Sequence, residues 1–270
     1  MSQRILYIDP VKGDVAEGGY RFLSRQKREE TELIRITLPR GPEHLEYHYY
    51  EALVLIDILH LVQEAETQGF DAADIGCFYD VGLHAAREVA KRMAVVAPCE
   101  ASVHIAATLG DTFSIIVGRR KCIPQMRENV RLYGMGDKLA SFKSVDLGVP
   151  EFHQDEKETA RRFIQVGREA IERDGAEVLV LGCTATYGFY QELQKELGVP
   201  VIDSMLAAFK TAEFAAELKN RFGWSPSKIG GYESPPPDEY RSWQLEKEYD
   251  FGDMGTWLRK TSRPATDKED

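Results

Sequence analysis

The chain contains GFDAADIGCFYDVGLHAAREVAKRMAVVAP (residues 69–98) and GAEVLVLGCTATYGFYQELQKELGVPVIDS (residues 175–204), two stretches that repeat one pattern. In each copy a glycine is followed by a short apolar strand, a Gly-Cys pair, a loop, a helix and a second strand. The cysteine lies eight positions after the first glycine in both copies, and the valine of the second strand lies 18 positions after the cysteine. A unit repeated in this way predicts two similar α/β lobes.

The repeat places Cys77 and Cys183 at equivalent positions, each at the carboxyl end of a predicted strand and before a helix. Open α/β sheets bind their ligands at this end. The start of a helix carries partial positive charge and free N–H groups, which favour a thiolate over a thiol. Two thiols facing each other across a cleft suit one reaction, in which a thiolate removes a proton from carbon and the other thiol returns a proton to the opposite face. The competing interpretation is that both are small buried core residues.

Apolar runs of strand length alternate with helical patterns along the rest of the chain, which is typical of a parallel α/β fold. We expect two similar Rossmann-like lobes with parallel sheets, related by a pseudo-twofold axis, with the active site in the cleft between them. The predicted strands cover residues 4–8, 33–38, 73–77, 94–97, 113–117, 142–146, 177–181 and 199–202. The predicted helices cover residues 49–68, 82–91, 101–109, 124–133, 156–174, 188–197 and 205–221.

The lobes divide the chain unevenly. We expect the first lobe, with Cys77, to hold residues 1–110 and about 205–222, and the second, with Cys183, to hold residues 111–204. Residues 223–270 differ in character, because they include three consecutive prolines and all three tryptophans. This composition predicts an extended C-terminal arm with short ordered pieces, lying over its own cleft or on a neighbouring subunit, and a frayed tail.

Composition narrows the class of protein. The chain has 270 residues, a net charge of −10 and a pI of about 5.2, which argues against a broad nucleic-acid surface. No apolar run approaches the ~18 residues of a membrane span, and the first residues lack the pattern of a signal peptide. The four cysteines show no CxxC spacing and are predicted to be free thiols. We therefore expect a cytoplasmic homo-oligomer that binds a small molecule and neither nucleic acid nor a membrane.

The cysteine motifs resemble those of the aspartate/glutamate/hydantoin racemase superfamily and, within it, the hydantoin and allantoin racemases. The segment CFYDVGLHAARE (residues 77–88) resembles the first cysteine motif, PCEASVHIAATLG (residues 98–110) the segment after it, and LGCTAT (residues 181–186) the second cysteine motif. The resemblance covers about residues 1–222. It implies a racemase or epimerase without cofactor or metal, in which Cys77 and Cys183 move protons on a small cyclic amide or carboxylated carbon acid, such as a hydantoin or allantoin.

Three loops depart from the family pattern. Asp-Pro-Val-Lys-Gly at residues 9–13 replaces an Asn-Pro-Asn-Thr type loop, Gly-Arg-Arg at 118–120 replaces a pair of threonines, and Asp-Val-Gly at 80–82 replaces Asp-Pro-Gly. The first two lie at the expected rim of the pocket, so they leave the substrate open more than the two-thiol chemistry. The alternatives are decarboxylation, isomerisation, or thiol-dependent hydrolysis or group loss on a hydantoin-like ring. A non-catalytic ligand-binding protein is a further alternative.

Several positions beside the cysteines and at the rim are predicted to contact the substrate. They are Asp9, Phe78, Tyr79, Arg119, Thr184 and Ala185. Thr184 and its neighbour Thr186 are either hydrogen-bond donors to the substrate or helix N-caps. Arg119 and Lys12 either pair with an anionic group of the substrate or are surface charges.

The remaining candidates have mainly structural interpretations. Asp80 is either a cap or a pocket group, with capping favoured, and Glu100 is a helix-start residue. Cys99 and Cys122 are expected to be structural, although Cys99 follows a strand and could lie near the pocket. The six histidines form no catalytic arrangement, and there is no GxGxxG motif for a nucleotide.

Overall fold

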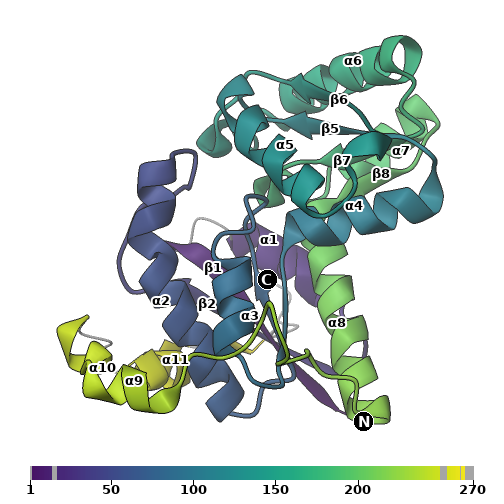
Figure 1. The fold of residues 1–270 in the computed structure, drawn as a ribbon. Coiled ribbons are helices and arrows are strands. Elements are labelled where there is room, and N and C mark those ends of the chain that lie inside the picture. The colour runs from purple at the N-terminus through teal and green to yellow at the C-terminus, as the bar shows by residue number, and fades with distance from the viewer. Residues whose placement is uncertain (1, 14–16, 250–253, 262, 265–270) are drawn as a thin grey trace.

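The computed structural model describes residues 2–13, 17–249, 254–261 and 263–264. It contains two sheets, which form two lobes, one above the other in Figure 1. The first sheet has the order β4-β3-β1-β2-β9 and the second has the order β6-β5-β7-β8. The strands are β1 (Gln3–Lys12), β2 (Thr31–Leu38), β3 (Ala72–Ile75), β4 (Ala94–Val96), β5 (Phe113–Val117), β6 (Leu139–Ser144), β7 (Val178–Leu181), β8 (Val201–Asp203) and β9 (Arg263–Pro264).

The two sheets share one topology, because β1 to β4 of the first correspond to β5 to β8 of the second. All pairs within these two sets of four strands are parallel, and the short strand β9 adds one antiparallel pair to β2. The predicted fold of two similar α/β lobes is therefore confirmed.

The helices connect and cover the two sheets. They are α1 (Glu17–Ser24), α2 (His48–Thr67), α3 (Leu83–Val89), α4 (Pro98–Leu109), α5 (Ile123–Leu132), α6 (Glu156–Asp174), α7 (Tyr190–Leu197), α8 (Ser204–Phe222), α9 (Pro237–Ser242), α10 (Leu245–Glu248) and α11 (Met254–Thr261). Helix α2 packs on β1, β2 and β3, and α6 packs on β5 and β6.

The helix that follows the last strand of each set crosses to the other sheet. Helix α4 follows β4 and contacts β5, β7 and β8, whereas α8 follows β8 and contacts β1, β3 and β4. The two crossing helices also contact each other between the lobes (Figure 1). Thus α4, which lies within the range 1–110 assigned to the first lobe from sequence, packs on the second sheet. This exchange fixes one lobe against the other.

Two glycines of each repeat have a clear structural reason. Gly69 and Gly175 follow α2 and α6 with φ of +78° and +74°, a left-handed conformation that glycine adopts without the steric cost of a Cβ. Gly76 and Gly182 precede the cysteines, and a Cβ on Gly76 would lie 2.3 Å from the Tyr7 hydroxyl oxygen. The Gly-Cys pairs therefore reflect close packing at the strand ends.

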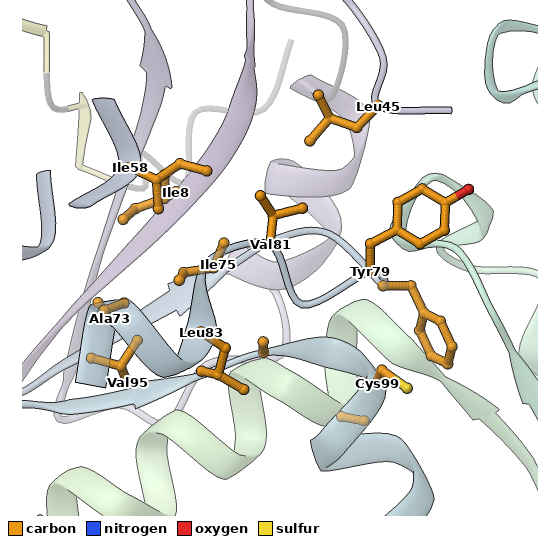
Figure 2. Close-up of a cluster of buried hydrophobic side chains, with 14 of the residues drawn as sticks. Ile8, Leu45, Ile58, Ala73, Ile75, Tyr79, Val81, Leu83, Val95 and Cys99 are labelled. Atoms are coloured by element: carbon orange, nitrogen blue, oxygen red, sulfur yellow. The ribbon is translucent and has the colours of Figure 1, made fainter. Parts of the chain in front are cut away.

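The loop that carries Cys77 is anchored in the hydrophobic core. Figure 2 shows Tyr79 and Val81 of this loop in the same buried cluster as Ile75 of β3 and Leu83 of α3. Phe78 belongs to the cluster as well and is 2% exposed. Burying a side chain of this size stabilises the fold by about 1.5–3 kcal/mol. The position of Cys77 is therefore set by its neighbours in the loop.

The described part of the C-terminal segment contains three short helices, α9, α10 and α11. Helix α11 packs on α2, Leu258 is fully buried, and the Trp257 indole N–H donates to the carbonyl of Thr37 at 3.1 Å. These contacts place α11 on its own first lobe, because its apolar face packs there. Residues 265–270 of the predicted tail lie outside the described residues. Among the described helices, none is both long enough and apolar enough to cross a membrane.

Candidate active site

A pocket of about 210 Å³ lies where the carboxyl ends of the two sheets meet. Its wall takes residues from equivalent places in both lobes: Asp9–Val11 from the end of β1, Gly76–Tyr79 after β3, Gly118 and Arg119 after β5, and Gly182–Ala185 after β7. The loops at residues 43–46 and 149–153 also contribute, and the wall is completed by Cys122, Met126, Tyr187 and Met205. All eight residues predicted from sequence for this site line the pocket: Asp9, Cys77, Phe78, Tyr79, Arg119, Cys183, Thr184 and Ala185.

The two thiols have matching surroundings. The backbone N–H of Tyr79 donates to the Cys77 sulfur, and the backbone N–H of Ala185 donates to the Cys183 sulfur. In both cases the donor lies two residues after the cysteine. Hydrogen bonds of this kind stabilise a thiolate, because they favour the charged form of the acceptor.

Burial outweighs these hydrogen bonds at both cysteines. It raises the pKa of Cys77 well above its ordinary value and raises the pKa of Cys183 to about 12. The sequence argument that helix N-termini would favour thiolates is wrong in this detail. Helix α3 begins at Leu83 and α7 at Tyr190, so each cysteine lies several residues before the α-helix that follows it, and a single 3-10 turn at Thr184–Thr186 begins directly after Cys183.

One hydrogen bond joins the two cysteine motifs directly. The Thr184 hydroxyl donates to the carbonyl of Gly76 at 3.0 Å. The Thr186 hydroxyl donates to the carbonyl of Cys183 at 2.6 Å. Neither threonine side chain caps a helix, so that interpretation is wrong, and both hydroxyl protons are directed at backbone carbonyls. The two threonines hold the cysteine loops in place.

Asp9 lies on the pocket wall and is held by an arginine that sequence reasoning missed. The carboxylate of Asp9 forms a short ion pair with the guanidinium of Arg35 on β2, and both side chains are buried. Arg35 also pairs with Glu17 of α1 at 2.9 Å. The register of β1 on β2 brings Asp9 beside Thr37, two residues along the strand from Arg35, which explains the contact.

The two candidate cations differ in position. Arg119 lies on the wall, with its guanidinium 3.5 Å from the Tyr47 hydroxyl and 3.8 Å from the carboxylate of Glu46. Lys12 is exposed and is not part of the wall. The loop at residues 9–13 thus contributes Asp9 to the pocket wall and directs its lysine elsewhere.

The other two cysteines also differ. Cys99 is fully buried at the start of α4 and lies outside the wall, as expected for a structural residue. Cys122 is buried too, yet it lines the pocket and forms a hydrogen bond with the Tyr79 hydroxyl. The turn after β5 brings Cys122 to the wall, a position that we did not predict. No sequence signal distinguished it from Cys99.

The acidic residues near the first motif are structural. The carboxylate of Asp80 accepts the backbone N–H groups of Cys99 and Glu100 at 2.8 and 2.9 Å, so it caps the start of α4. The Glu100 carboxylate pairs with the guanidinium of Arg87. Neither acid lines the pocket.

Sequence reasoning missed His153, which lines the pocket beside the second motif. Its Nε2 lies 2.9 Å from the carbonyl oxygen of Ala185, and its Nδ1 lies 2.8 Å from the carboxylate of Glu156. Its ring stacks on that of Tyr187, with the centroids 4.4 Å apart. No local pattern around residue 153 indicates this role, because its partners lie after a different strand. Within the described ranges, no three His, Cys, Asp or Glu side chains are grouped to hold a metal ion.

Comparison with known proteins agrees with this geometry. The sequence model of the Asp/Glu/Hydantoin racemase family matches residues 21–212. A hydantoin racemase of Paenarthrobacter aurescens is 36% identical over 239 residues, which is 88% of this chain and 99% of that protein. A hydantoin racemase of Pseudomonas sp. (strain NS671) is 34% identical over 79% of this chain and 84% of its own length. The solved allantoin racemase from Klebsiella pneumoniae superimposes with a TM-score of 0.80 and 29% identity, over 87% of this chain and 94% of that one. The chain therefore belongs to the Asp/Glu/Hydantoin racemase family and is an isomerase of the racemase type.

Proposed function

We propose that the protein racemises a hydantoin-like cyclic amide by proton transfer between Cys77 and Cys183, without a cofactor. One observation carries the proposal: two thiols, one from each lobe, line a single pocket at equivalent strand ends. The matching backbone donors, Tyr79 N–H and Ala185 N–H, support it further. A pocket that merely binds a ligand has no need of two matched thiols.

The reaction needs one thiolate and one thiol. The thiolate takes the proton from the ring carbon next to the carbonyl, so that a C–H bond breaks, an S–H bond forms and the electron pair moves onto the carbonyl oxygen as an enolate. The other thiol then gives its proton to the opposite face of the same carbon and becomes the thiolate. Because either cysteine can begin the cycle, both enantiomers are substrates.

The surroundings of the thiols fit this exchange of roles. Burial raises the pKa of each cysteine toward that of a weak carbon acid, which brings the donor and acceptor closer in proton affinity. The N–H groups of Tyr79 and Ala185 stabilise whichever sulfur is charged. The buried carboxylate of Asp9, held by Arg35, offers an acceptor for a ring N–H of the substrate.

The names of the relatives favour hydantoins or allantoin as substrates of this chain as well. The direct test follows a single enantiomer of 5-benzylhydantoin in deuterated water by polarimetry and NMR. We expect loss of optical rotation together with deuterium at C5 and an intact ring. Ring opening, or binding without exchange, would contradict racemisation in favour of hydrolysis or a binding role.

A further inference from the structure

Tyr79 and Ala185 supply the backbone N–H groups that face the two thiols. The backbone carbonyl of each of these residues is in turn contacted by a side chain. The side-chain amide of Asn129 on α5 donates to the carbonyl of Tyr79 at 2.8 Å. On the other side, Nε2 of His153 lies 2.9 Å from the carbonyl oxygen of Ala185. Tyr79 and Ala185 are the residues whose N–H groups donate to Cys77 and Cys183. For each thiol, a side chain therefore holds the residue whose backbone N–H faces the sulfur.

The hydrogen bonds of His153 define its orientation. A carbonyl oxygen only accepts, so Nε2 must carry a proton to bond with Ala185. The carboxylate of Glu156 lies 2.8 Å from Nδ1 and accepts from it when that nitrogen is protonated. Stacking on Tyr187 and on Phe189, with centroids 4.4 and 5.4 Å away, holds the plane of the ring.

On the Cys77 side, a side-chain amide takes the place of the imidazole ring as the group that contacts the backbone carbonyl. Asn129 is a neutral amide on the helix that follows β5, and it reaches across to the loop after β3 in the first sheet. Tyr79 itself is buried in the core, so this loop is already restrained. Ala185 has a small side chain and only partial burial, so its loop depends more on His153.

We propose that Asn129 and His153 are positioning residues, one for each thiol. Asn129 holds Tyr79 so that its N–H faces Cys77, and His153 holds Ala185 so that its N–H faces Cys183. Neither side chain takes part in proton transfer itself. The inference deepens the proposed function and rests on it for the roles of the thiols, but the contacts predict a measurable property of each sulfur without any substrate.

The test measures alkylation of the two cysteines separately, by iodoacetamide labelling and peptide mass spectrometry at one fixed pH. A thiol that loses part of its N–H donation has a higher pKa, and one pKa unit changes the reactive thiolate fraction about tenfold. We expect His153→Ala to slow Cys183 by roughly three- to tenfold and to leave Cys77 unchanged. Asn129→Ala should slow Cys77 and leave Cys183 unchanged, with a smaller factor because the core holds Tyr79.

Two further variants separate positioning from general loss of structure. His153→Gln keeps an N–H donor for the Ala185 carbonyl, so it should restore most of the Cys183 rate. His104→Gln serves as the matched control, since His104 also contacts a backbone carbonyl, that of Glu100, but lies outside the pocket wall. If His153→Ala fails to fold, Glu156→Gln replaces it, and Cys183 should slow more than Cys77.

Three results would overturn the inference. They are equal slowing of both thiols in either single variant, a Cys183 rate in His153→Gln as slow as that in His153→Ala, and wild-type rates for both thiols in all variants. Failure of the wild-type protein to racemise hydantoins would instead refute the proposed function and leave the alkylation contrast intact. The two failures are therefore distinguishable.

Discussion

Adding one methyl group at Gly182 should both destabilise the protein and impair its chemistry. In the Gly182→Ala variant the new Cβ would lie 2.8 Å from Cγ2 of Ile115, 3.1 Å from Cγ1 of Val117 and 3.2 Å from the carbonyl oxygen of Ile116. Ile115 and Val117 are buried in the core, and protein interiors are close-packed. Overpacking of this kind costs about 1–3 kcal/mol. The strand end must therefore shift, and Cys183 is the next residue.

The size of the effect can be measured in two ways. A loss of 1 kcal/mol lowers the melting temperature of a domain of 150–250 residues by roughly 2–4 °C, so we expect a fall of about 2–12 °C. A displacement of about 1 Å at a reacting group can reduce turnover by ~10²-fold. Gly231→Ala is the matched control, because a Cβ at Gly231 meets nothing within 4 Å. Wild-type melting and turnover in Gly182→Ala would refute the packing argument for the Gly-Cys pair.

Four further outcomes are expected. Burial lowers the pKa of His60 from 6.5 to about 4, so the folded state favours the neutral ring. The stability that His60 contributes is therefore full above pH 6.5 and is lost as the pH falls toward 4. Urea titrations should show this loss in the wild type and a smaller loss in His60→Gln. Leu258→Ala should lower the free energy of unfolding by about 2–5 kcal/mol because Leu258, on the face of α11 that packs on the first lobe, is fully buried, and an unchanged urea midpoint would show that this helix does not hold the first lobe. Cys99→Ser should retain turnover, whereas Cys122→Ser should raise KM, because Cys122 lies on the wall beside Tyr79; equal kinetics of the two variants would count against that placement. The mainly apolar wall should favour 5-benzylhydantoin over allantoin, whose ureido group needs polar partners, and a higher kcat/KM for allantoin would contradict this expectation.

The sequence was most informative where a feature repeats or has a regular period. Most of the parallel strands follow apolar runs, and Phe113–Val117 and Glu156–Asp174 have the bounds that the pattern predicts. Strand β6 was harder to place, since every residue of this edge strand is only half-buried and its sequence lacks a continuous apolar run. Helix α1 was not predicted, because its eight residues include two glycines.

In the pocket too, features that depend on local sequence could be predicted, and contacts between distant segments of the chain could not. The repeat predicted the equivalent positions of Cys77 and Cys183, since both depend on the same local pattern of strand, Gly-Cys and loop. The contacts of Arg35, Asn129 and His153 were not predictable, because each joins segments that are far apart in the chain and no motif surrounds them. The direction of the thiol pKa shifts was not predictable for a related reason: burial, which raises the pKa of both cysteines, is a property of the assembled pocket.

The claim that two thiols act on opposite faces of one carbon is tested most directly by deuterium exchange with each pure enantiomer of 5-benzylhydantoin. The wild type should exchange and racemise both enantiomers. Cys77→Ser and Cys183→Ser should each lose racemisation by at least ~10²-fold, the usual scale for an acid/base group. Each variant keeps one thiol, so we expect each to exchange the C5 proton of one enantiomer only, with opposite preferences and with retention of configuration. Exchange of both enantiomers at equal rates by either variant, or undiminished racemisation by one of them, would contradict the two-thiol account.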